Sequence, residues 1–151
     1  MDITKNAEKA PVLKTLPSRL LGQTAALVGR VAGDALADAG SHRYAFAVLA
    51  TLDAFGPLSQ AELCRRTDLD RSDMNGTVNA LEAEGSVTRR PDPADRRQNI
   101  VALTEAGRTR FDDLERRLSA AQDKALAPLS GDERALLVQF LQRLHDHLSP
   151  G

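Results

Sequence analysis

Apolar residues recur every three or four positions along most of the chain, which is the period of an amphipathic α-helix. The pattern predicts helices over about residues 16–38, 43–55, 60–67, 71–84, 104–126 and 130–148. Residues that favour a helix start precede three of these segments: the capping-box pairs Ser59/Glu62 and Ser130/Glu133, and the N-cap residue Asp70. Gly85 and Pro128 stand where two of the helices are expected to end.

Between Gly85 and Thr104 the apolar period changes from about four to two, which is typical of β-strands. Residues 87–90 and 99–103 predict two short strands, and the polar segment 91–98, with two prolines, predicts the turn between them. The fold class is therefore mainly α with a small β-hairpin.

The length of 151 residues suits one domain. Residues 1–15 are polar without a clear period, so we expect a mobile N-terminal arm before a single domain over 16–151. Inside that domain, residues 43–103 form a compact unit between amphipathic flanks at 16–38 and 104–148. Apolar residues of the second flank have the heptad-like spacing of helix-on-helix packing, at Phe111, Leu114, Leu118, Ala121 and Ala125.

Two helices joined by a short turn, over residues 59–84, have the arrangement of a helix-turn-helix. The inward stripe of the second helix leaves small and amide-bearing residues together on the opposite face: Ser72, Asn75, Gly76 and Asn79. An asparagine can read adenine with a paired donor and acceptor in the major groove, and small residues permit close approach to DNA. An ordinary solvated helix face has the same pattern, so both interpretations stay open at this point.

The tip of the predicted hairpin combines Arg96 and Arg97 with Asp92 and Asp95. A guanidinium group fits the narrow, negative minor groove of A·T-rich DNA, and a neighbouring carboxylate can hold it extended. The alternative is a salt-bridged turn in solvent. Net charge is −1, which argues weakly against a nucleic-acid partner, but residues 86–110 hold six arginines against three acidic residues.

Several function classes find little support in the sequence. There is no Ser-His-Asp set, phosphate loop or metal-ligand cluster, and His145 and His147 are two positions apart, so they do not face each other on a helix. We expect no enzyme, cofactor or metal site. No signal peptide or membrane-length apolar run is seen, and Cys64 is the single cysteine, so we expect a cytoplasmic protein with Cys64 as a small buried hydrophobe.

Four segments together resemble the winged helix-turn-helix of the MarR family of transcriptional regulators: Gly56–Leu63, Leu81–Gly85, Asp92–Arg97 and Val101–Gly107. The resemblance covers about residues 16–148 and implies dimerisation through the flanks 16–38 and 104–148. It also implies that Arg97 enters the minor groove with Arg96 beside it and Asp95 as orienting partner. The DNA-binding residues expected on this basis are Arg71, Ser72, Asp73, Asn75, Gly76, Asn79, Arg89, Arg96 and Arg97.

The chain departs from the family pattern at two positions of the expected recognition helix, 71–84. Asp73 is a carboxylate that either stabilises the helix N-terminus or accepts from cytosine N4, and the sequence leaves both open. Asn79 stands where a basic residue is frequent in the family, so base preference does not transfer from relatives.

The resemblance also implies a small aromatic or anionic ligand near the start of the second helix, where cationic and aromatic side chains gather: His42, Arg43, Tyr44 and Phe46. A helix start packed against the dimer partner is the alternative. The leading hypothesis is a sequence-specific double-stranded DNA-binding regulator, such as a repressor, that binds a near-palindromic operator as a homodimer. A winged-helix protein-interaction module without DNA binding is the second hypothesis, motivated by the nearly neutral charge.

Overall fold

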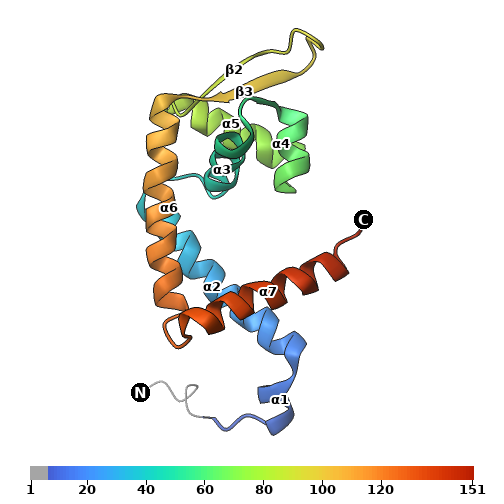
Figure 1. The fold of residues 1–151 in the computed structure, drawn as a ribbon, viewed down its shortest axis with the longest axis vertical. Helices are drawn as coiled ribbons and strands as arrows, with labels where there is room; N and C mark the ends of the chain where they lie inside the picture. Colours follow the sequence, from blue (N-terminus) through green and yellow to red (C-terminus); the bar gives the residue numbers. More distant parts are fainter. Residues whose placement is uncertain (1–6) are drawn as a thin grey trace.

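The computed structural model describes residues 7–151, and most of them are helical (Figure 1). The helices are α1 (Pro11–Thr15), α2 (Pro17–Asp38), α3 (Ala45–Phe55), α4 (Gln60–Thr67), α5 (Arg71–Ala83), α6 (Glu105–Ala125) and α7 (Gly131–Leu148). The strands are β1 (Leu58–Ser59), β2 (Val87–Pro91) and β3 (Asn99–Leu103). The predicted fold class, mainly α with a small β-hairpin, is confirmed.

The elements divide into a head and a set of flanking helices (Figure 1). The head, residues 45–103, contains α3, α4, α5 and the sheet, and the β2–β3 hairpin projects from it. Helix α6 runs away from the head and packs along α2, and α7 follows from the end of α6 that is remote from the head.

One hydrophobic core holds the head together and includes the middle of α6. Its fully buried members come from α3, α4, α5, both hairpin strands and α6, and the largest are Leu49, Leu52, Leu63, Met74, Leu81 and Leu114. Three residues of the predicted heptad-like spacing, Phe111, Leu114 and Leu118, pack in or against this core. Much of that stripe therefore makes contacts within its own chain.

The predicted helix boundaries follow from local hydrogen bonds. The Asp70 carboxylate accepts from the Asp73 amide at 2.7 Å, and Gly85 has the positive φ of 81° that a residue with a Cβ resists. Ser130 and Glu133 form the complete capping box that their spacing predicts.

The capping box predicted at the start of α4 is only half correct. The Ser59 hydroxyl accepts from the Glu62 amide at 3.1 Å, as expected. The Glu62 carboxylate, however, does not turn back to Ser59 but binds Arg65 and Arg66, which lie one turn ahead on the same helix. These two cations hold the pKa of Glu62 below its ordinary value, with the Arg65 hydrogen bond as the largest cause.

The structure contains two elements that the sequence pattern does not predict. Strand β1 has only two residues and pairs antiparallel with β3, giving the sheet order β1-β3-β2. Two residues are too few to show a period of two, so this pairing has no sequence signal.

Helix α1 lies within the expected N-terminal arm. Pro11 occupies the first turn of α1, where its fixed φ and missing amide hydrogen suit a helix start. The expected arm over 1–15 thus contains a short helix at residues 11–15, its mobility stays a prediction, and residues 1–6 lie outside the described part. Within residues 7–151, no helix is both long enough and apolar enough to cross a membrane.

The contact between the start of α6 and the turn that follows α5 depends on Gly107. A Cβ at this position would lie 1.9 Å from the Ser86 carbonyl oxygen, which already accepts from the Thr104 amide and hydroxyl, each at 3.0 Å. Close packing of these backbones therefore requires glycine at position 107.

We predict that Gly107→Ala lowers the free energy of unfolding by about 2–3 kcal/mol, because the two backbones must separate. Gly76→Ala is the matched control: its Cβ would meet no described atom within 4 Å, so it should stabilise α5 by about 1 kcal/mol. Urea unfolding followed by circular dichroism at one protein concentration compares the two variants. Equal midpoints would contradict the close contact.

Candidate nucleic-acid interface

Helix α5 has one buried face and one exposed polar face. Met74, Thr77, Val78 and Leu81 are buried in the head. The predicted outward stripe is exposed over its whole length, at Ser72, Asn75, Gly76 and Asn79, and Arg71 and Asp73 are exposed beside it. The structure therefore brings the six residues predicted on this helix to the surface, and α4 packs against α5 within the head.

The hairpin between β2 and β3 ends in an ordered turn rather than a loose loop. The strands pair in register from Val87 with Leu103 to Pro91 with Asn99. At the tip, the Asp92 amide donates to the Gln98 carbonyl at 2.8 Å, and the Gln98 amide donates to the Asp95 carbonyl at 2.9 Å. These bonds fix the backbone from which both tip arginines extend.

The backbone amide of Arg97 is hydrogen-bonded to Asp95, whereas most of the Arg97 side chain is exposed. The Asp95 carboxylate accepts from the Arg97 amide at 3.1 Å and lies 3.4 Å from its Nε, while the Arg97 side chain is 92% exposed. An exposed pair of this kind adds little to stability, so its main effect is on the direction of the side chain. Asp95 thus contacts the arginine that it is expected to orient, and that role stays a prediction. Arg96 lines a shallow hollow on the same tip together with Pro91 and Pro93.

Arg89 lies between the hairpin and α5, where it is only 17% exposed. Its guanidinium donates to four side-chain oxygens: Gln60 Oε1 at 3.3 Å, Asn75 Oδ1 at 3.4 Å, Glu82 Oε1 at 3.3 Å, and Asn79 Oδ1. The sequence predicted Arg89 as a DNA-contacting residue, and that role stays a prediction. In the structure this side chain links β2 to α5.

Gln60 is a residue of the site that the sequence did not identify. Its Oε1 accepts from Arg89 and lies 3.5 Å from the Asn99 Nδ2, so it joins α4 to both strands of the hairpin. A polar residue in the first position of a helix is ordinary, and its long-range partners leave no local pattern in the sequence.

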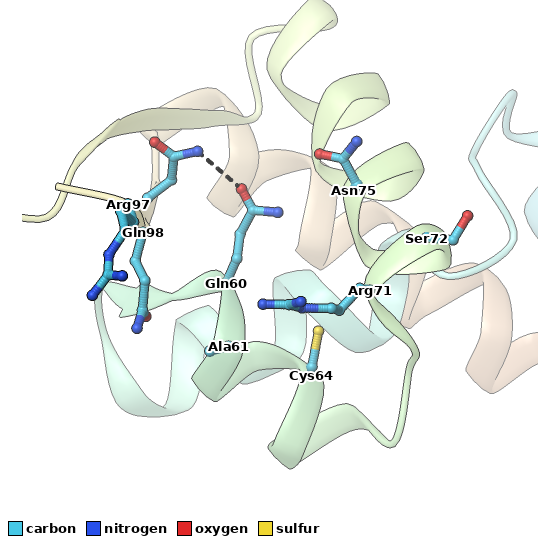
Figure 2. A pocket seen from close by; sticks show the side chains of 9 residues that line it. Gln60, Ala61, Cys64, Arg71, Ser72, Asn75, Arg97 and Gln98 are labelled. Atoms are coloured by element: carbon cyan, nitrogen blue, oxygen red, sulfur yellow. Dashed lines mark hydrogen bonds between the residues drawn. The ribbon is translucent and has the colours of Figure 1, made fainter. Parts of the chain in front are cut away.

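A hollow of about 440 Å³ opens between α4, the start of α5 and the hairpin (Figure 2). The Arg71 side chain reaches across it from α5 toward Gln60, and Arg97 lies on the hairpin side. The hollow therefore has guanidinium groups on two of its walls, which favours an anionic group such as a phosphate.

Cys64 also lines this hollow and is partly rather than fully buried. Its Sγ lies 3.9 Å from the Asp70 carbonyl oxygen, and its hydrocarbon side packs against the core. The expectation of a buried small hydrophobe is thus only partly correct. Burial is the main cause that raises the pKa of the Cys64 thiol above its ordinary value.

Three of the four residues predicted to bind a ligand gather before α3. The rings of His42 and Tyr44 have centroids 6.1 Å apart, and the Arg43 guanidinium lies 4.6 Å from the Tyr44 ring centroid. Phe46 instead stacks on Phe111 at 5.5 Å against the core. Ligand binding by these residues stays a prediction.

We predict that Cys64 reacts slowly with iodoacetamide near neutral pH, about threefold or more below a free cysteine, because only the thiolate is nucleophilic and a raised pKa lowers its fraction. The rate should increase with pH to a midpoint above that of the same protein in denaturant. Mass spectrometry of the labelled chain measures both series. Equal rates in the folded and denatured protein would contradict the burial of this thiol.

The family model for the MarR family matches residues 41–98. The HTH-type transcriptional repressor NicR of Pseudomonas putida is 35% identical over 101 residues, which cover 67% of this chain and 64% of NicR. The matched part therefore spans less than two thirds of the length of that relative.

Solved structures extend the likeness to almost the full length. The crystal structure of a probable transcriptional regulator from Pseudomonas aeruginosa is 30% identical, with a TM-score of 0.75 over 87% of this chain and 98% of the other. CouR from Rhodococcus jostii RHA1, solved bound to p-coumaroyl-CoA, is 26% identical, with a TM-score of 0.75 over 94% and 98% of the two chains. From these matches, and from the winged helix-turn-helix built by α4, α5 and the β2–β3 hairpin, the chain belongs to the MarR family.

Proposed function

We propose that this protein is a transcriptional regulator that binds double-stranded DNA as a homodimer on a near-palindromic operator. The observation that carries the proposal is that two exposed elements lie on one head. Helix α5 exposes a polar stripe, and the hairpin that carries Arg96 and Arg97 at its tip projects from the same head (Figure 1). The major groove accepts one α-helix, and the adjacent minor groove accepts an extended guanidinium group. The names of the relatives as transcriptional regulators support a regulator rather than an enzyme.

The positions of the arginines support contact with the DNA backbone despite the net charge of −1. Arg71 and Arg97 line the hollow between α5 and the hairpin, and Arg90 and Arg96 are exposed on the hairpin itself. Phosphate contacts depend on local cations rather than on the charge of the whole chain. A duplex lying over this hollow would meet guanidinium groups on both sides of it.

Uncovered apolar side chains on α2 and α7 support the homodimer. They lie outside the head and include Leu20, Leu27, Val31, Phe140, Leu141 and Leu144. Large apolar patches of this kind usually belong to an interface. A two-fold partner on these helices would present two copies of α5 about 34 Å apart, which is one turn of DNA and explains a near-palindromic site.

Modulation by a small aromatic or anionic ligand is the finer part of the proposal. CouR was solved with p-coumaroyl-CoA, which has both characters. In this chain, Arg43 and Tyr44 supply a cation and an aromatic ring, and the His42 Nδ1 lies 3.3 Å from the Thr77 hydroxyl on α5. A ligand at this cluster would therefore be one side chain away from the recognition helix.

We predict that Arg97→Ala weakens operator binding roughly tenfold or more, about 1.4 kcal/mol, because it removes the minor-groove contact. Fragments selected from the organism's own genome provide the operator, and mobility shifts at several salt concentrations measure affinity. The matched control is Arg116→Ala, an arginine on α6 whose side chain is 76% exposed. Unchanged affinity for Arg97→Ala would count against the hairpin assignment. If no DNA is selected, or binding is insensitive to salt, the protein-interaction module becomes the better hypothesis.

We predict that Leu141→Glu converts the dimer to a monomer at micromolar concentration, because a buried carboxylate in an apolar interface lacks a partner. Gln142→Glu places the same side chain on the neighbouring exposed position of α7 and should leave the dimer intact. Sedimentation velocity distinguishes the two states. A monomeric unmodified protein would refute the dimer, and a dimeric Leu141→Glu variant would refute the assignment of this face.

A further inference from the structure

The contacts of Arg89 control how the recognition helix presents its two asparagines. Arg89 reaches α5 from β2, and its guanidinium contacts Asn75 Oδ1 at 3.4 Å and also Asn79 Oδ1. A guanidinium group has five donors and no acceptor, so an amide that binds it must turn its oxygen toward it. Both asparagines therefore have their oxygens committed to Arg89, and their NH2 groups are the part left for DNA.

This orientation is held by further contacts on the other sides of Arg89. Glu82 Oε1 lies 3.3 Å from its Nη2, and Gln60 Oε1 lies 3.3 Å from its Nη1. The side chain is 17% exposed, and charge-assisted hydrogen bonds are about twice as strong as neutral ones. A DNA phosphate would have to replace several of these contacts at once to draw Arg89 away.

An asparagine side chain that offers only its N–H donors to the groove prefers other bases than one that also offers its oxygen as an acceptor. In the major groove, guanine presents two acceptors, O6 and N7, and thymine presents O4, whereas cytosine presents an amino group that donates and adenine presents such a group beside a single acceptor, N7. The bidentate pairing of asparagine with adenine needs the amide oxygen as well as the nitrogen. When the asparagine oxygen is bound to Arg89, its NH2 group can still donate to guanine or thymine. The amino group of an adenine or cytosine opposite the asparagine, in contrast, finds no acceptor on it.

We propose that Arg89 is a positioning residue for specificity, and that it makes Asn75 and Asn79 select the keto bases guanine and thymine instead of adenine. The inference rests on the proposed DNA-binding function. It changes the expectation drawn from the asparagines alone, which is adenine. Arg89 acts through the two amides and needs no base contact of its own.

Selection from a randomised duplex with the purified full-length chain, followed by sequencing, tests the proposal. The unmodified protein should enrich guanine or thymine at the positions that change when Asn75 or Asn79 is replaced by alanine. Arg89→Met retains much of the aliphatic packing but removes the donors, so the amides can turn. At the same positions it should raise the ratio of adenine to the keto bases roughly tenfold, the size of a discrimination of about 1.4 kcal/mol.

Asn79→Asp is a second variant that does not disturb the fold, because the residue is exposed. Its carboxylate still accepts from Arg89 but offers an oxygen to the groove in place of the NH2 group. It should therefore shift one position of each half-site toward cytosine or adenine, whose amino groups donate. Glu82→Gln is the control: it keeps an acceptor for Arg89 and should leave the preferred bases unchanged.

The outcomes separate this inference from the function on which it rests. If the unmodified protein selects adenine at these positions, or if Arg89→Met leaves the selected sequence unchanged, the role of Arg89 is refuted while DNA binding stands. If the unmodified protein selects no sequence at all, the DNA-binding function fails, and this inference fails with it. Retained helical circular dichroism verifies that Arg89→Met is folded.

Discussion

Burial of the inner face of α5 is the constraint on which the rest of the molecule depends. Met74, Val78 and Leu81 fill the centre of the head, and Val87 and Val101 bring the two hairpin strands into the same core. Because the same core holds both elements, the outer face of α5 and the hairpin have fixed positions relative to each other. The proposed binding to two grooves of one duplex would need this rigidity, since an error in the position of either element would misplace the other.

Much of the fold could be predicted because its signals are local. The period of apolar residues, Asp70 as an N-cap and Gly85 as a helix stop define α5, and the change of period defines the hairpin. The same period separates the exposed from the buried face, so the candidate site on α5 could be predicted as a set. Helix α1 and strand β1 were not predicted, because elements of five and two residues are too short to show an apolar period.

The polar junction around Arg89 could not be predicted for a different reason. Arg89 and Gln60 are 29 positions apart, and they meet only because the hairpin and α4 pack on the same core. A sequence shows that an arginine is present but not whether it points to solvent or to neighbouring amides. The distinction matters because a solvent-facing arginine contributes affinity for any phosphate, whereas an arginine bound to α5 would, on the proposal above, affect which bases that helix accepts.

The contacts between the head and the flanking helices would also limit how a ligand could regulate the proposed DNA binding. Arg89 ties the hairpin to α5, so a small displacement of one element carries the other with it. The start of α6 is bound to the head through the Thr104 hydroxyl, which donates to the Gly85 and Ser86 carbonyls, and through the close approach of Gly107 to Ser86. A change at the flanking helices would therefore move the head as a body. In the proposed dimer, such a change would alter the separation of the two heads, and with it the fit to both half-sites, while α5 and the hairpin of each head would keep their relative positions.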